Sequence, residues 1–251
     1  MGIEMERLRN MGQIKTKIQN DWLLYLAAIL TTMLMRCFIR ASDTDMLKWI
    51  LAPTARWAGI LAGITFEYLP HQGYVNHGSE FLIAASCSGS RFMLLTFLML
   101  VFIPADPQRE DIGSKCRRLG VSIVLAYLFT VFVNGIRIVL SIRIPVFLEG
   151  LHVLGGWLTP DRLHTLIGTV TYFASLCVIY QCAAAKTGNG RLAVPVFWYL
   201  LIVLALPFVK RVWHNDWTGF GEYAVLIIGV CLVVRVVLGV LGKKFHNLIG
   251  I

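Results

Sequence analysis

A short polar turn, Ser86-Cys87-Ser88-Gly89, interrupts a largely apolar stretch of the sequence. Cys87 is the candidate nucleophile, because a thiol attacks as its thiolate and ionises more readily than a serine hydroxyl. Arg91 follows one helical turn later, and a nearby cation or a helix N-terminus favours the thiolate. The small residues leave room for a substrate backbone, and their N–H groups are candidates for an oxyanion hole. The alternative is a buried cysteine beside helix-capping serines.

Arg137 lies near the end of a second apolar stretch, FVNGIRIVL, and Asn134 precedes it by three residues. At this spacing both side chains share one face of a helix, so Asn134 can orient the guanidinium group. An arginine at the centre of a membrane span costs about 2.5–3.5 kcal/mol on insertion scales. That cost is consistent with a functional role, such as stabilising an oxyanion or gripping a carboxylate. An anchor to lipid headgroups is the alternative.

His164 follows Asp161 by three residues in the segment PDRLHTLIGTV. A histidine beside a carboxylate is a candidate general acid or base. The other histidines in the expected outer loops leave a metal site open as an alternative: His71, His77, His152 and His214. Because the chain has no HExxH or Hx3H spacing, we expect neither a metal ion nor another cofactor.

The composition indicates the elements that must position these residues. Hydrophobic residues make up 57% of the 251-residue chain and charged residues only 15%, with a mean hydropathy of +0.70. A soluble domain of this size needs a more charged surface. We therefore expect an all-α integral membrane protein, a single transmembrane domain over residues 1–251. The six expected spans are 22–39, 86–103, 119–140, 164–182, 192–209 and 223–241.

Basic residues gather in residues 1–20, in the loop 104–118, in the turn 183–191 and at Lys243 and Lys244. Lysine and arginine are enriched in cytoplasmic segments, so both termini are expected in the cytoplasm. These flanks also account for the net charge of +9. Because no RNA- or DNA-binding motif is present, we expect membrane lipids and no nucleic acid as partners.

Residues 46–65 are apolar but interrupted by Lys48, Pro53 and Arg56. We expect a helix lying in the membrane interface, with Trp49 and Trp57 at the level of the headgroups. If this segment crosses the membrane instead, the span count becomes seven and the N-terminus lies outside. The segment 66–83, rich in Gly, His, Tyr and Asn, is expected to be a loop.

This topology brings three distant residues to one membrane depth. Cys87 begins the second expected span at its outer end, Arg137 lies near the outer end of the third, and His164 begins the fourth. We therefore expect the three side chains to surround one cleft on the outer face of the membrane.

The pattern resembles the exosortase/archaeosortase family. The motifs that carry the resemblance are Cys87-Ser88-Gly89, Asn134-Gly135-Ile136-Arg137 and His164. The stretches LAPTARWAGILAGITFEY and GYVNHGSEFLIAASCSGSRF look most like the exosortase K subgroup. The resemblance covers residues 22–182, and the last two spans share only general hydrophobicity with the family.

The resemblance implies a cysteine protease or transpeptidase of the bacterial inner membrane. Its substrates would be exported proteins with a C-terminal sorting tail: a short motif, a transmembrane helix and a basic cluster. Cys87 would be the nucleophile, and Arg137 with His164 would complete the catalytic site. From their places beside these three residues, rather than from the resemblance, we also expect the following residues to contact the substrate: Ser86, Ser88, Gly89, Arg91 and Asn134.

Two other functional classes remain open. A polytopic transporter would use Arg137 and His164 to line a polar pathway, but the ionisable residues lie mostly at span ends. A non-catalytic membrane assembly subunit would make the common depth of the three residues a coincidence.

Overall fold

The computed structural model describes residues 2–103, 111–150, 158–184, 193–205, 208, 212 and 220–249. Most of these residues are helical. Five helices are long and apolar enough to cross a membrane: Asp21–Ala41, Ala85–Phe102, Ile112–Gly150, Pro160–Ala183 and Phe220–Val240. The fold is therefore consistent with the expected helical membrane protein.

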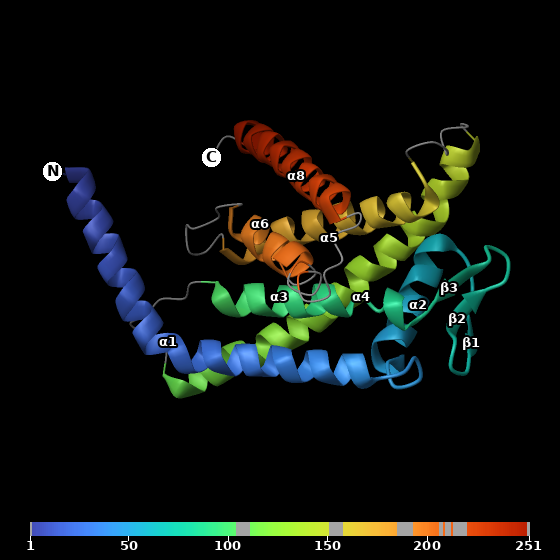
Figure 1. Ribbon diagram of the computed structural model, residues 1–251, viewed down its shortest axis with the longest axis horizontal. Coiled ribbons are helices and arrows are strands. Elements are labelled where there is room, and N and C mark those ends of the chain that lie inside the picture. The colour runs from blue at the N-terminus through green and yellow to red at the C-terminus, as the bar shows by residue number, and fades with distance from the viewer. Residues whose placement is uncertain are drawn as a thin grey trace.

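The elements follow one another along the chain with three short strands between the second and third helices (Figure 1). The first part contains α1 (Gly2–Ala41), α2 (Lys48–Ala62), β1 (Glu67–Leu69), β2 (Gly73–Asn76), β3 (Phe81–Ile83) and the 3₁₀ turn η1 (Ala85–Cys87). The second part contains α3 (Ser90–Phe102), α4 (Ile112–Gly150), α5 (Pro160–Ala184), α6 (Ala193–Leu200), the π-helical η3 (Leu201–Ala205) and α8 (Phe220–Ile249).

The segment 66–83 is not a simple loop, so the expectation of an all-α chain is wrong at this point. Its three strands form an antiparallel sheet in the order β1-β2-β3. Tyr68 pairs with Tyr74 in the register, and the two rings lie 5.2 Å apart between centroids. Strands of three or four residues are too short to show a clear period-two hydrophobic pattern, which is why the sequence suggested a loop.

The fifth expected span, 192–209, is shorter in the described residues. Here α6 continues into η3, giving an apolar helix over Val194–Ala205 that is shorter than the five candidate spans. Residues 206–207 and 209 lie outside the described part of the chain. By contrast, the third expected span, 119–140, extends at both ends into the 39-residue helix α4.

Helix α3 lies at the centre of the molecule, between α1 on one side and α5, α6 and α8 on the other (Figure 1). All residues from Phe92 to Val101 are buried. Met93 and Phe97 pack with α1, α2 and α4, whereas Phe92 and Leu95 pack with α5, α6 and α8. The turn that carries Cys87 leads directly into this central helix, so the packing of α3 fixes its position.

Three contacts at the C-terminal end of α3 show which ends of α1 and α4 lie beside it. Lys115 of α4 lies 3.0 Å from Asp21 of α1, and the rings of Tyr25 and Phe102 stack with centroids 4.5 Å apart. Arg118 donates hydrogen bonds to the carbonyls of Val101, at 2.6 Å, and Ile103 at the end of α3. The starts of the α1 span and of α4 therefore lie beside the end of α3, and Cys87 lies at the opposite end of α3.

Helix α2 packs along α4 and is shorter than the hydrocarbon core of a bilayer. Its 15 residues extend over about 22 Å, against about 30 Å for the hydrocarbon core. Pro53 has no N–H to bond the carbonyl of Trp49, and the hydroxyl of Tyr127 in α4 donates to that carbonyl instead, at 2.9 Å. Trp57 donates from Nε1 to the carbonyl of Phe132 at 3.2 Å.

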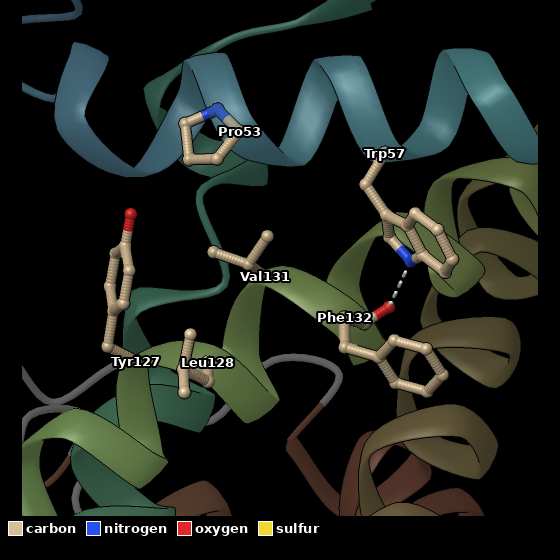
Figure 2. A pocket seen from close by; sticks show the side chains of 6 residues that line it. All are labelled: Pro53, Trp57, Tyr127, Leu128, Val131 and Phe132. Carbon is tan, nitrogen blue, oxygen red and sulfur yellow. Dashed lines mark hydrogen bonds between the residues drawn. The ribbon is translucent and has the colours of Figure 1, made fainter.

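An apolar recess of about 240 Å³ lies between α2 and α4, and Figure 2 shows the Trp57–Phe132 hydrogen bond beside it. Its lining comes from both helices: Pro53, Trp57, Tyr127, Leu128, Val131 and Phe132. The hydrogen bonds of Tyr127 and Trp57 hold α2 against the part of α4 that leads to Asn134 and Arg137.

Candidate active site

Cys87 ends the 3₁₀ turn that precedes α3. Its N–H donates to the carbonyl of Ala84 at 2.9 Å, and the N–H of Ser88 donates to Ala85 at 3.2 Å. Gly89 is the N-cap of α3, and the N–H of Met93 donates to its carbonyl at 3.1 Å. Cys87 is half-buried in the turn that leads into the N-cap of α3.

Gly89 is required by the shape of this turn. Its φ of +71° lies in the left-handed region, which residues with a Cβ adopt at a cost. A Cβ at this position would lie 3.1 Å from the side chains of both Asn134 and Thr130 in α4. The glycine therefore lets the Cys87 turn approach α4 closely.

The other expected substrate-binding residues differ in exposure. Ser86 is exposed, and its Oγ lies 4.0 Å from the Sγ of Cys87. Ser88 is buried, and its N–H donates to the carbonyl of Ala85. This N–H is therefore not free to bind an oxyanion in this conformation. Arg91 is exposed in the first turn of α3.

Asn134 lies between the nucleophile turn and the rest of the site. Its Nδ2 donates to the carbonyl of Cys87 at 2.6 Å. Its Oδ1 accepts from the hydroxyl of Tyr172 at 2.7 Å and from Nη1 of Arg137 at 3.4 Å. The expected orientation of the arginine by Asn134 is thus present as a long hydrogen bond, and the same amide also reaches Cys87.

Arg137 contacts His164 directly, with 2.5 Å between Nη2 and Nε2. A guanidinium group can only donate, so Nε2 accepts and His164 is neutral with its proton on Nδ1. The partner of His164 is therefore Arg137 rather than Asp161, which is exposed in the first turn of α5. The Nε of Arg137 is buried without a hydrogen-bond partner among the described residues, and it faces Gly168.

One chain of contacts therefore joins residues from η1, α4 and α5: the main-chain carbonyl of Cys87 and the side chains of Asn134, Arg137 and His164. Comparison with known proteins finds no matching family model, no curated relative and no similar solved structure.

Tyr172 is a polar residue of the site that the sequence did not single out. It lies on α5 two turns after His164, and its ring stacks on Phe92 with centroids 4.9 Å apart. The guanidinium carbon of Arg137 lies 5.5 Å from the centre of the same ring. The spacing of His164, Gly168 and Tyr172 at intervals of four residues places them on one helix face, which was the available signal.

A second polar group lies between the end of α1 and the β1–β2 turn. Side-chain atoms of Asp43, Asp45 and His71 lie within 4.8 Å of one another, close enough to bind a metal ion. Asp45 already accepts hydrogen bonds from the hydroxyl of Tyr68 and from the N–H of His71, at 3.0 Å for the latter. Nothing else points to a metal here, so we assign none. His77 instead pairs with Glu67 at 3.4 Å. His152 and His214 lie outside the described residues.

Proposed function

We propose that this protein is an exosortase-like cysteine protease or transpeptidase that cleaves the C-terminal sorting tails of exported proteins. It acts at the outer face of the bacterial inner membrane, with both termini in the cytoplasm. The five long helices and the shorter α6–η3 segment form its six spans, and α2 lies in the interface. Its partners are membrane-tethered protein substrates and the surrounding lipids, and it uses no cofactor.

The chain of contacts from Cys87 through Asn134 and Arg137 to His164 is the observation that carries this proposal. The residues that it joins carry a thiol in the turn before α3, a buried guanidinium group and a neutral imidazole. These are a nucleophile, a group to stabilise an oxyanion and a proton carrier. The three groups come from elements that are far apart in sequence. A purely structural contact would not require a thiol, a guanidinium group and an imidazole together.

In the first half of the reaction, Cys87 attacks the carbonyl carbon of the scissile peptide bond. The thiol proton passes to Nε2 of His164, and the carbonyl oxygen becomes an oxyanion that Arg137 stabilises. As the guanidinium turns toward the oxyanion, it releases Nε2, so the base becomes available when the charge develops. The imidazolium then protonates the leaving amine, the C–N bond breaks, and a thioester remains on Cys87.

In the second half, an acceptor amine or water attacks the thioester. His164 takes a proton from the acceptor and returns it to the departing sulfur of Cys87. A new amide or a free carboxylate results, and the enzyme regains its initial state. Substrate and enzyme are both held in the membrane, so the cleavage motif reaches Cys87 at a fixed depth.

The test is co-expression with candidate substrates. Proteins of the same genome that end in a short motif, one apolar span and a basic cluster are expressed with the wild-type enzyme, Cys87→Ala or His164→Ala at matched abundance. We expect processing by the wild type only, because Cys87→Ala lacks the nucleophile and His164→Ala lacks the group that takes the thiol proton and protonates the leaving amine. Processing is read by mass spectrometry.

Full processing by Cys87→Ala would overturn the proposal. Failure of every tailed protein to be processed by the wild type would also count against it, and the transporter and assembly-subunit alternatives would then lead. Cys182→Ala is the matched control, since this exposed cysteine lies at the opposite end of α5 from His164. It should process substrate like the wild type.

A further inference from the structure

The orientation of the Asn134 amide is determined by its three partners. Arg137 can only donate, and the carbonyl of Cys87 can only accept. Oδ1 therefore faces Arg137 and Nδ2 faces Cys87. Asn134 is fully buried, so no water competes for either end of the amide. The hydroxyl of Tyr172 donates to the same Oδ1, and at 2.7 Å it is much closer than the 3.4 Å contact from Arg137.

The hydroxyl of Tyr172 is itself held in place by its ring. Phe92, in the first turn of α3, stacks on one side with an interplanar angle of 16°. Because Phe92 belongs to the buried central helix, the ring of Tyr172 is fixed relative to the helix that follows Cys87. The Tyr172 hydroxyl is therefore a short, well-fixed donor that holds Oδ1 of Asn134 in the orientation that Arg137 and the Cys87 carbonyl require.

The main chain at Cys87 depends on this amide. The hydrogen bonds of the turn use the carbonyls of Ala84, Ala85 and Gly89. The carbonyl of Cys87 itself is bound by Nδ2 of Asn134, from a different helix. If the amide rotated, Oδ1 would face the Cys87 carbonyl, and two acceptors would repel each other.

We infer that Tyr172 is a positioning residue for the Cys87 nucleophile, acting through the orientation of the Asn134 amide. The inference rests on the proposed function in taking Cys87 as the nucleophile, but it concerns the thiol's presentation and can be measured without a substrate. Tyr172 makes no covalent contribution and transfers no proton.

The experiment is a double-mutant cycle on the rate of Cys87 alkylation by N-ethylmaleimide, followed by mass spectrometry of the Cys87 peptide. Tyr172→Phe keeps the stacked ring and removes only the hydroxyl. We expect Tyr172→Phe and Asn134→Ala each to change the alkylation rate constant at least threefold in the same direction. In the Asn134→Ala background, Tyr172→Phe should have no further effect, because the two residues act as one unit.

Tyr180→Phe is the matched control: it removes a hydroxyl from another buried tyrosine of α5 and should leave the alkylation rate at the wild-type value. If Asn134→Ala does not fold, Asn134→Asp replaces it, since a carboxylate keeps the acceptor for Tyr172 and lacks the donor for Cys87. In the processing assay, Tyr172→Phe should lower kcat about tenfold and leave KM unchanged, as expected for a misplaced nucleophile.

An unchanged alkylation rate in Tyr172→Phe would overturn the inference, and so would an equal effect with and without Asn134. A loss of thermal stability without coupling to Asn134 would assign the hydroxyl a purely structural role. The two proposals can fail separately. If Tyr172 and Asn134 are coupled in the alkylation rate but no substrate is processed, the enzyme proposal is rejected and the positioning role is kept. If substrate is processed but the two residues are not coupled, the positioning role is rejected and the enzyme proposal is kept.

Discussion

Arg137 uses two of its donors on two different partners, Asn134 and His164. Lysine keeps the charge but has a single ammonium group, which cannot reproduce the planar fork. We expect Arg137→Lys to lower processing by about 100-fold or more, the size of effect seen when an oxyanion donor is removed. Arg91→Lys is the control at an exposed position and should be mild. Wild-type processing by Arg137→Lys would reduce this residue to a headgroup anchor.

Alanine variants of two glycines with similar backbone conformation can distinguish the effect of backbone strain from the effect of side-chain packing. Gly89 and Gly63 have φ values of +71° and +68°, but a Cβ on Gly63 would meet nothing within 4 Å. Each change to alanine should cost about 1–2 kcal/mol of folding free energy in backbone strain. Only Gly89→Ala should also push against Asn134 and change the rate of Cys87 alkylation. An equal change of that rate in Gly63→Ala would show that the effect is not local.

At the scale of elements, the site depends on how closely α2 approaches α4. A Cβ on Gly135 would lie 2.3 Å from Cδ1 of Trp57, so no side chain fits there without moving the indole of Trp57 or α2 itself. Gly135 is next to Asn134, and we expect Gly135→Ala to destabilise the fold by about 1–3 kcal/mol through overpacking. Thermal unfolding in detergent and the processing assay measure the two consequences.

Gly120 provides the control on the same helix, because a Cβ there meets nothing within 4 Å. Gly120→Ala should be neutral or stabilising by up to about 1 kcal/mol, since alanine favours a helix more than glycine does. Combining Gly135→Ala with Trp57→Leu should recover part of the lost stability. If Gly135→Ala proves as harmless as Gly120→Ala, α2 does not fix the position of Asn134.

The hairpin of β1 and β2 is tied to the start of α2 through Asp45. The hydroxyl of Tyr68, and then the N–H of His71, lower the pKa of Asp45 below its usual 3.8. Because the folded-state pKa is the lower one, this contribution to stability is complete above pH 3.8 and is lost as pH falls through the folded value. Hydrogen exchange of residues 67–83, corrected for the intrinsic rate, should show loss of protection in that acid range.

Tyr68→Phe removes the largest cause of the shift and should move the midpoint upward, toward pH 3.8. Asp45→Asn should abolish the transition, because the amide does not titrate. The same midpoint in Asp45→Asn as in the wild type would assign the acid response to another group.

For the whole molecule, the proposed orientation places Cys87 outside and Cys116 inside. Cys116 lies at the start of α4, next to the Lys115–Asp21 pair, at the opposite end of α3 from Cys87. In variants that keep one cysteine, a membrane-impermeant maleimide added to spheroplasts should label Cys87 and not Cys116. After permeabilisation both should react, since Cys116 is exposed and Cys87 is half-buried. The reverse pattern in intact spheroplasts would invert the topology.

The sequence by itself predicted a helical membrane protein, with which the structure is consistent, and most of its long helices. Hydropathy is a local property, so runs of about 20 apolar residues identify helices that can cross a bilayer whatever their neighbours are. The pairing of Asn134 with Arg137 was also predictable, because three residues separate them on one helix. The same reasoning could not show the short sheet of residues 67–83, whose strands depend on pairing with one another.

Only the tertiary structure decided which of these residues meet. The bonds from Asn134 to Cys87, from Tyr172 to Asn134 and from Arg137 to His164 join residues 47, 38 and 27 positions apart. Such contacts depend on how α3, α4 and α5 pack, and packing is set by the shapes of many side chains together. For that reason the sequence suggested Asp161 as the partner of His164 and gave no weight to Tyr172, whereas the packed helices bring Arg137 to the histidine and Tyr172 to Asn134.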